Sequence, residues 1–503
     1  MTYRIAILGD FSGRAARGLV ETGDALAGAR AIKFDIDALE EVIEGFGTEI
    51  VLPIGEGGVA VPLPDLDALH PDELYANVEM FQELAGLRRQ LKSGRADQVA
   101  ERLAAMGAAV PVPPPPPSQA SVVPVGTLSD FEGLIGGRAA AVEASPADEI
   151  IRRVMGPHVV AAPDPGVPAM IAAVDAALSS AMSLVLHHPE LRAIEASWRE
   201  LEFLARRIET GEDVSLTLYD ISAAEIAADL AAAPSPEESG LARLLRDARP
   251  GEAGYDLLAG LYTFEKIPPH AGLLARLGRL AGGLGTPFLA AIDPDGLAEG
   301  EVAADAAWAS LRALPEADWL ALATPEVMLR RPYGRRTDPI ERFAYEEFDR
   351  KAGLKGLLWG NPVVVLVTLL AADGGRGGAH VADDMPYHVT EDRHGDQVQL
   401  PCTSRAMTSA AVAAVEAAGV IPIVSTKGRD EVRVGAYQTL SGRALPAPST
   451  PNRPTPPPSG AVQFAAGLSR VELDEMRAAR RARAVGTGGD EVDPDLARLL
   501  EGL

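Results

Sequence analysis

The sequence predicts an α/β protein made of two mixed α/β domains. Short apolar runs bounded by glycine or proline, which are typical of buried strands, recur between longer segments whose apolar residues have helical spacing. A proline-rich tract, Pro111–Ser118, separates a first region of about a hundred residues from a longer second region. A chain of 503 residues is long enough for two or three domains with buried cores.

The first region is predicted to begin with a buried strand over 3–9, YRIAILG, and a turn that follows it. A strand over Ala31–Asp37, an acidic helix over Ala38–Gly45 and two strands joined through Gly55–Gly58 come next. A single helix is predicted over Leu69–Ser93, with proline in its first turn. Its apolar stripe consists of Leu74, Val78, Phe81, Leu84, Leu87 and Leu91.

The second region is organised around His187–Val214, which reads HHPELRAIEASWRELEFLARRIETGEDV. Pro189 suits the first turn of a helix, and Glu190 lies near the positive end of the helix dipole. Glutamate and arginine alternate on the remaining faces at spacings that allow ion pairs along the helix. The apolar stripe consists of Leu191, Ile194, Trp198, Leu201 and Leu204. This pattern predicts a long packing helix, preceded by another over about 166–185 and followed by a strand.

The rest of the second region continues the alternation of helices and strands. Ser222 is a good N-cap for a helix, and GLLARLGRLAGGLG predicts a helix between the strands GYDLLAGLYTF and TPFLAAID. WLALAT predicts a further strand, followed by a short helix that carries Arg330 and Arg331. Pro362 is expected to start a fully buried helix, and GVIPIVSTKGRDEVRV predicts a strand pair.

The composition changes after Arg443, where a second proline-rich linker begins. Beyond it Ser469, with Glu472 three positions later, forms a capping box for a short helix rich in arginine. The predicted organisation is a first domain, a linker, a second domain, a second linker and a tail with this basic helix, over 1–105, 106–165, 166–443, 444–466 and 467–503.

Charge and composition exclude several classes of function. A net charge of −25 disfavours binding to nucleic acid, which needs a basic surface. The single cysteine, Cys402, rules out an intramolecular disulfide and a multi-cysteine metal site. The N-terminus lacks a signal-peptide pattern, and no run is read as a membrane span, so no membrane insertion and a cytoplasmic location are expected.

No constellation of residues predicts catalysis, a cofactor or a metal. The turn after the first strand lacks the lysine and the glycine spacing of a phosphate loop. Adjacent histidines at His187 and His188 point in different directions, and the histidines and aspartates near Asp383 match no ligand spacing. A basic cluster at 330–336 could bind an anion, but pairing with one of three nearby acids is favoured, namely Glu341, Glu346 or Glu347.

Motifs in both regions resemble the contractile sheath proteins of type VI secretion. The first region, with RIAILGDFSGR, KFDIDALEEVI and HPDELYANVEMFQELAGLRRQL, resembles the small sheath subunit (TssB-like). The second, with ALSSAMSLVLHHPELRAIEASWRELEFLA, MLRRPYG, FAYEEF and LLWGNP, resembles the large subunit (TssC-like). The motif residues that carry the resemblance are Gly9, Asp10, Phe11, Ser12, Gly13, His188, Pro189, Glu195, Trp198, Arg199, Arg330, Pro332, Tyr333, Gly334, Glu346, Glu347, Trp359, Gly360, Asn361 and Pro362.

The resemblance implies a structural protein without catalytic chemistry. Such subunits form a helical tube around an inner tube, the tube contracts to drive effectors into a target cell, and an AAA+ unfoldase recycles it. The implied partners are other sheath subunits, the inner tube protein, baseplate components and that unfoldase. The two subunits are ordinarily separate chains, so this chain reads as a fused form, and a tether makes their docking intramolecular.

The chain also departs from the family pattern. The arm that usually precedes the LGDFSG strand and the region that usually follows about Gly442 are not recognised in the sequence. Two readings are therefore open: a fused sheath protomer, or a sheath-related accessory protein that docks on, caps or regulates a sheath. An anion- or nucleotide-dependent enzyme that uses the cluster at 330–336 is a third.

Overall fold

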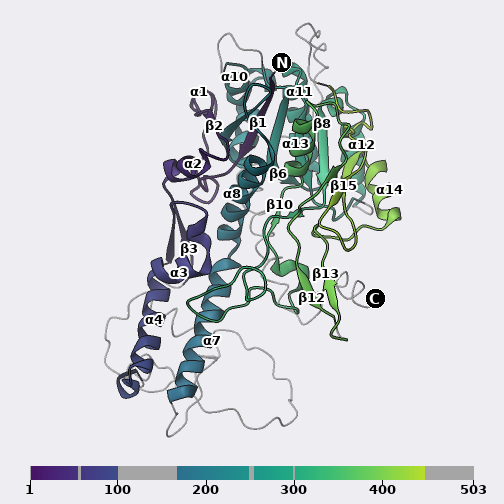
Figure 1. Ribbon diagram of the computed structural model, residues 1–503. Helices are drawn as coiled ribbons and strands as arrows, with labels where there is room; N and C mark the ends of the chain where they lie inside the picture. Colours follow the sequence, from purple (N-terminus) through teal and green to yellow (C-terminus); the bar gives the residue numbers. More distant parts are fainter. Residues whose placement is uncertain are drawn as a thin grey trace.

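The computed structural model describes residues 2–54, 58–99, 167–247, 254–297, 301–392 and 394–447. The first proline-rich linker, the second from residue 448 onward and the predicted basic helix lie outside these residues. Figure 1 shows one large sheet with helices on both of its faces, and two long helices, α4 and α7, that project away from it. The predicted α/β class is confirmed.

In the described residues the main sheet has nine strands in the order β11-β15-β14-β8-β7-β6-β1-β5-β2. Six strands, from β14 to β5, run parallel to one another. At the edges β2 pairs antiparallel with β5 and β15 pairs antiparallel with β14, and β11 pairs antiparallel with β15. The strands are β1 (Tyr3–Gly9), β2 (Ile32–Lys33), β5 (Val214–Asp220), β6 (Leu257–Phe264), β7 (Phe288–Ile292), β8 (Leu320–Thr324), β11 (Val381–Ala382), β14 (Val420–Ser425) and β15 (Val432–Val434).

Strand β1 lies in the middle of this sheet, between two strands of the second region. All seven of its residues are in register with β5, from Tyr3 opposite Val214 to Gly9 opposite Asp220, and its other edge pairs with β6. Both edges of β1 are therefore occupied by backbone hydrogen bonds. The first region does not build a main sheet of its own but shares the sheet of the second region.

Two hydrophobic cores lie on opposite faces of the sheet, because side chains alternate along each strand. Ile5 and Ile7 of β1 point into one core, while Ala6 and Leu8 point into the other. A central parallel strand is buried on both faces, which explains why YRIAILG is apolar throughout. The first core is covered by α4 (Glu79–Lys92), α7 (Val167–Leu186), α8 (Pro189–Arg207) and α13 (Val363–Ala372). The second is covered by α9 (Ala223–Ala232), α10 (Gly240–Asp247), α11 (Pro268–Leu284), α12 (Val302–Arg312) and α14 (Ser409–Ala417).

The remaining elements of the first region lie on both faces of the sheet. Helix α2 (Leu39–Phe46) and the antiparallel hairpin of β3 (Thr48–Leu52) and β4 (Val59–Leu63) pack beside α8, and α3 (Pro71–Asn77) packs against α4. Helix α1 (Asp24–Ala27) instead packs against α10, and its Leu26 belongs to the second core. The strand predicted over Ala31–Asp37 is only two residues long. The single helix predicted over Leu69–Ser93 is wrong, because Val78 adopts an extended conformation, with φ −89° and ψ 125°, that separates α3 from α4. Its predicted apolar stripe is buried nonetheless.

Helix α7 is the one described helix that is long and apolar enough to cross a membrane by length and composition. No run of this kind was predicted from the sequence. Half of the apolar window of α7 is buried inside the protein, where the helix packs against α4. Arg88 of α4 pairs with Asp175 of α7 at 2.6 Å, so the helix also carries a charge that the protein itself satisfies.

Most predicted elements of the second region are present. The Ser222 N-cap, the helix after Pro362 and the β14–β15 pair are confirmed, and the structure adds that Glu225 completes a capping box with Ser222. The short helix predicted to carry Arg330 and Arg331 is wrong, since these residues follow the two-residue strand β9 (Val327–Met328) in an extended loop. Small antiparallel pairs join β9 to β10 (Trp359–Gly360) and β12 (Val389–Glu391) to β13 (Gln397–Gln399).

Candidate functional site: a buried ion-pair cluster and a closed strand-end loop

Arg330 lies at the centre of a buried cluster of charges. Its Nε is 2.6 Å from Oε1 of Glu195 on α8, and one terminal nitrogen is 2.6 Å from Oε2 of Glu347. The other terminal nitrogen bridges both carboxylates, at 3.3 and 3.0 Å. The side chains of Glu195 and Glu347 are 0 and 2% exposed, so one guanidinium bridges two buried negative charges.

The loop around Arg330 is shaped to hold this pair. The backbone N–H of Tyr333 donates to Glu347 at 2.7 Å, and the guanidinium of Arg330 lies 4.0 Å from the centre of the Tyr333 ring. Burial alone would raise the pKa of Glu347, but the charge of Arg330 and these hydrogen bonds hold it below its usual range. Glu347 therefore stays ionised. Of the three acids considered as partners of the basic cluster, it is the one that pairs with Arg330.

The neighbouring motif residues Pro332, Gly334 and Glu346 form the turn beside this cluster. Oε1 of Glu346 accepts the N–H of Arg335 at 3.1 Å, and a Cβ at Gly334 would lie 2.2 Å from Oε2 of the same carboxylate. The carbonyl of Pro332 accepts the hydroxyl of Thr337. Two consecutive glutamates thus have separate roles, one in an ion pair and one in a turn.

The start of α8 is fixed by its own sequence. Nδ1 of His188 accepts the N–H of Glu190 at 3.3 Å, and Pro189 occupies the first turn. Further along, Arg199 pairs with Glu202 at 2.8 Å and lies 4.0 Å from Glu195, so it borders the buried cluster. His188 is therefore a helix cap in this structure.

The WGNP motif joins α8 to the buried helix α13. The backbone N–H of Asn361 donates to Oε1 of Glu200 on α8 at 2.6 Å, and its side-chain amide donates to the carbonyl of Tyr262 on β6 at 3.2 Å. Oδ1 of Asn361 in turn accepts the N–H of Val363 at 3.0 Å, next to Pro362, which caps α13. One asparagine thus connects α8, β6 and α13.

Gly360 and Trp359 complete this junction. Strand β10 pairs with β9, and a Cβ on Gly360 would lie 2.5 Å from the side chain of Leu329, which would have to move to make room. The indole N–H of Trp359 donates to the carbonyl of Leu354 at 2.8 Å.

Glu200 is a buried carboxyl whose pKa is raised to about 8 by its burial, with a smaller contribution from the charge of Glu326. The unfolded chain releases this proton near the ordinary pKa of glutamate, so it binds fewer protons than the folded chain between about pH 4.5 and 8. Stability is therefore expected to fall as the pH rises through that window. Glu200→Gln should stabilise the protein by about 1–3 kcal/mol at pH 8 and by much less at pH 5, measured by urea unfolding at both values.

Glu202, two positions along the same helix, provides a matched control for that experiment. It is paired with Arg199 and Arg206, which hold its pKa below the usual range against the effect of burial. Glu202→Gln should therefore not stabilise the protein at pH 8. Equal effects of the two substitutions would contradict the assignment of Glu200 as the destabilising buried acid.

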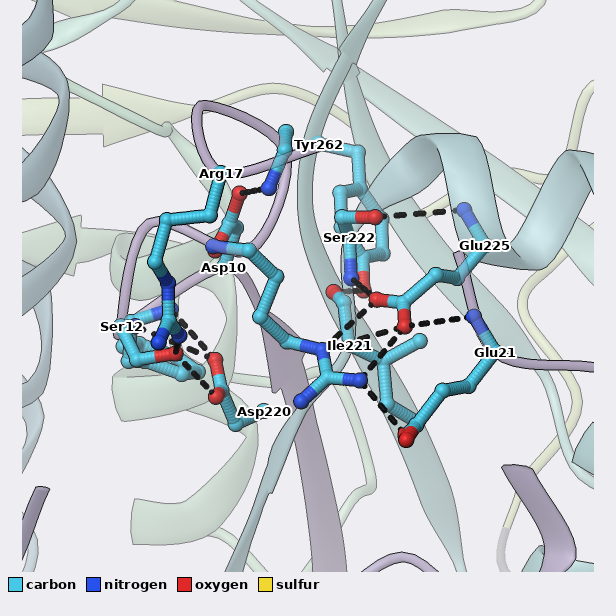
Figure 2. A network of polar contacts seen from close by, with 12 residues as sticks. Asp10, Ser12, Arg17, Glu21, Asp220, Ile221, Ser222, Glu225 and Tyr262 are labelled. Carbon is cyan, nitrogen blue, oxygen red and sulfur yellow. Dashed lines mark hydrogen bonds and ion pairs between the residues drawn. The ribbon is translucent and has the colours of Figure 1, made fainter. Parts of the chain in front are cut away.

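The loop after β1 closes the carboxyl end of the sheet (Figure 2). Asp220, at the end of β5, accepts the N–H groups of Phe11 and Ser12 at 2.8 and 3.2 Å and the Ser12 hydroxyl at 2.6 Å. Asp10 accepts the N–H groups of Arg14 and Ala15 at 2.6 and 2.9 Å. In open α/β sheets, ligands bind at the point where the strand order reverses, which in this chain is between β1 and β6. The loop after β1 borders that point, and its hydrogen bonds tie it to the end of β5.

A second ion pair ties this loop to α9. Two nitrogens of Arg14 lie 2.9 and 2.7 Å from the carboxylate of Glu225, whose side chain is fully buried. Burial would raise the pKa of Glu225, but Arg14 and the N–H groups of Ser222 and Glu21 hold it below its usual value. Figure 2 shows the carboxylate surrounded by these donors.

Phe11 leaves the same loop in the opposite direction and packs on α8. Its ring centre lies 5.6 Å from that of Trp198, and the ring centre of Phe46 on α2 lies 5.2 Å from that of Trp198. Gly9 and Gly13 flank this residue: a Cβ on Gly9 would lie 2.7 Å from the Phe11 ring, and Gly13 has a φ of +72°. Trp198 is thus a packing residue that joins α8 to both the loop and α2.

The charged groups of both clusters are bound by neighbouring residues of the chain. The carboxylates of Asp10, Asp220 and Glu225 each accept hydrogen bonds from backbone or arginine, and the buried cluster at Arg330 is satisfied by its own partners. Within the described ranges no group of three or more histidine, cysteine, aspartate or glutamate side chains could hold a metal ion. These hydrogen bonds and ion pairs hold helices and strands of the protein together.

Sequence reasoning found the motifs but not all of their contacts. It did not pair Glu195 with Arg330, because 135 positions separate them, and it did not single out Arg14, Glu200, Asp220 or Glu225. One of these residues could have been found from the sequence. Glu200 is a charged residue next to the apolar stripe of a helix, on the side that faces the interior, and such a residue needs a buried partner.

The fold and these two networks define a structural α/β protein whose motif residues bind one another. A family model described as VipB: EvpB/VC_A0108, tail sheath N-terminal domain matches residues 168–441, more than half of the chain. The chain therefore belongs to this tail sheath family.

A relative supports the same assignment. The type VI secretion system sheath protein TssC1 of Pseudomonas aeruginosa is 26% identical to this chain over 303 residues. The match covers 54% of this chain and 60% of the relative, so the chain spans less than two thirds of the relative's length.

Proposed function

We propose that this chain is a structural protomer of a type VI secretion contractile sheath, in which a small-subunit-like segment and a large-subunit-like segment are fused. The observation that carries the proposal is the family match over 168–441, in a chain whose buried charged groups serve its own fold. The fused character rests on the resemblance of the first region and on how that region packs.

The position of β1 supports the fusion. Strand β1 pairs with β5 over its full length and also pairs with β6. The first region therefore contributes a strand to the main sheet, whose other strands include those of the residues matched by the sheath family. Trp198 of α8 packs between Phe11 and Phe46, both from the first region. Two subunits that depend on each other in this way gain from a tether, because the tether raises their effective concentration.

A loop of the second region, at residues 341–343, also contacts helices α3 and α4 of the first region. Asp72 of α3 accepts the N–H groups of Glu341 and Arg342 at 2.9 and 3.0 Å, and Phe343 stacks on Tyr75 with 5.3 Å between ring centres. Arg88 of α4 donates to the carbonyl of Arg342 at 3.1 Å. This contact involves the FAYEEF motif, so a motif of the large subunit serves here to hold the small-subunit-like helices.

Within this proposal the chain works by assembly in the cytoplasm. Its partners are other sheath subunits, the inner tube protein, baseplate components and the AAA+ unfoldase that recycles contracted sheaths. Contraction would come from a change between two packings of the same protomers, without a chemical step in the chain.

Negative-stain microscopy of the purified chain, alone and with its inner tube protein, tests the proposal. Long tubes are the expected result for a protomer. Discrete particles that decorate the end or side of a sheath would instead favour an accessory protein that caps or regulates it. The melting temperature measured with and without nucleotides and divalent ions tests the hypothesis of an anion- or nucleotide-dependent enzyme, since a specific ligand would stabilise the fold and raise this temperature. No shift is expected, because Arg330 is committed to Glu195 and Glu347.

A further inference from the structure

The outer side of the first region is a surface to which none of the described elements binds. Helix α2 and the β3–β4 hairpin each pack one side against α8 and turn the other to solvent. On the hairpin the outward cross-strand pairs are Glu49 opposite Pro62 and Val51 opposite Ala60. Val51 is 58% exposed and Ile36, just before α2, is 45% exposed, so the surface combines apolar side chains with acids.

The charge of this surface is strongly one-sided. The 54 residues from 34 to 87 contain thirteen aspartates and glutamates and no lysine or arginine. The exposed acids on α2, its entry and β3 make no ion pair with any described residue. These acids are Asp37, Glu40, Glu41, Glu44 and Glu49.

The opposite charge pattern occurs near the C-terminus of the same chain. Met476–Val485, MRAARRARAV, has four arginines and no acid, in a chain with a net charge of −25. In the helix that the Ser469 capping box predicts, Arg477, Arg480 and Arg481 share one face with Leu473 and Met476, at spacings of three and four residues. That face combines apolar groups with the basic charge that the acidic surface lacks.

The chain is long enough to bring the two together. The described residues end at Ala447, and the 21 residues from 448 to 468 separate it from Ser469. Fully extended, they span roughly 70 Å. The whole width of the main sheet, with nine strands, is only about 40 Å. The segment can therefore reach the surface from either edge of the sheet.

We propose that Ser469–Arg483 docks on the acidic outer surface formed by α2 and the β3–β4 hairpin of its own chain. Both partners lie outside the residues matched by the sheath family, so the contact is a property of this chain beyond its proposed sheath role. Each surface ion pair contributes little, but several pairs with an apolar centre act together, and the tether makes the contact intramolecular.

Crosslinking in the full-length chain tests this docking. Glu41→Cys with Arg480→Cys places one thiol on each side, and the native Cys402 is buried and does not compete. Ala306→Cys on α12 with the same Arg480→Cys is the matched control, because Ala306 is exposed and α12 covers the other face of the sheet. The first pair should form an intramolecular crosslink at least about tenfold faster than the control, and the advantage should vanish near 1 M salt.

Charge exchange makes the test specific. Glu40→Lys with Glu44→Lys should remove the advantage of the first pair, and adding Arg477→Glu with Arg481→Glu should restore it. All four positions lie on solvent-facing or terminal segments, and unchanged melting temperatures confirm that the variants fold. Equal crosslinking rates for the two cysteine pairs, failure of the exchanged charges to restore the rate, or a product of double mass would overturn the proposal.

Discussion

Arg330→Ala is expected to destabilise the protein by about 3–5 kcal/mol, because it removes the guanidinium that forms hydrogen bonds with both buried carboxylates. Glu195 and Glu347 are almost fully buried, and Arg330 makes four hydrogen bonds to them. The loss should appear as a lower midpoint of urea unfolding followed by circular dichroism. It should be smaller at pH 5 than at pH 8, because without Arg330 the pKa of Glu347 rises and the carboxyl can become neutral.

Arg336→Ala is the matched control for this prediction. Arg336 belongs to the same basic cluster, but its side chain is 78% exposed and pairs only with the exposed Glu391 at 3.1 Å. Its removal should cost less than about 1 kcal/mol. If both substitutions have the same small effect, Arg330 is a surface residue in solution and the buried cluster is wrong.

Trp198→Ala is expected to cost about 3–5 kcal/mol, the usual range for removal of a buried tryptophan. The indole is 0% exposed and packs against Phe11 and Phe46, so the cavity would open where the first region meets α8. Limited proteolysis should then cut the first region faster than the second.

Trp198→Phe distinguishes lost volume from lost polarity. Among the described residues the indole N–H of Trp198 has no hydrogen-bond partner. Replacement by phenylalanine therefore removes packing volume but breaks no hydrogen bond. A cost clearly below that of alanine is expected, at about 1–2 kcal/mol. Phenylalanine and alanine variants of equal stability would show that the aromatic contacts contribute nothing.

The periodicity of the sequence was sufficient to predict most elements. Continuous apolar runs predicted the buried parallel strands, and the spacing from Leu191 to Leu204 predicted α8. The break at Val78 could not be predicted, because valine fits the helical stripe and only tertiary packing makes it extended. The helix assigned to Arg330 failed for a similar reason, since its side chain is drawn toward Glu195 on a distant element.

Strand order was beyond sequence reasoning as well. A strand at residues 3–9 gives no sign that its neighbours start at residues 214 and 257, since local periodicity carries no information on pairing partners. The motif residues of the candidate site were all named from the sequence. Their contacts, such as those of Asn361 with Glu200 and Tyr262, depend on how α8, β6 and α13 converge.

The most direct measurement of the fused-protomer account is a sizing experiment on protein cleaved between its two regions. A specific protease site placed within 111–117 would cut the chain after purification, and the control is the same protein left uncut. Because β1 pairs on both edges and Trp198 packs on the first region, the two fragments should elute together at the volume of the uncut chain and separate only in denaturant. Two fragments that elute apart in native buffer would contradict the account.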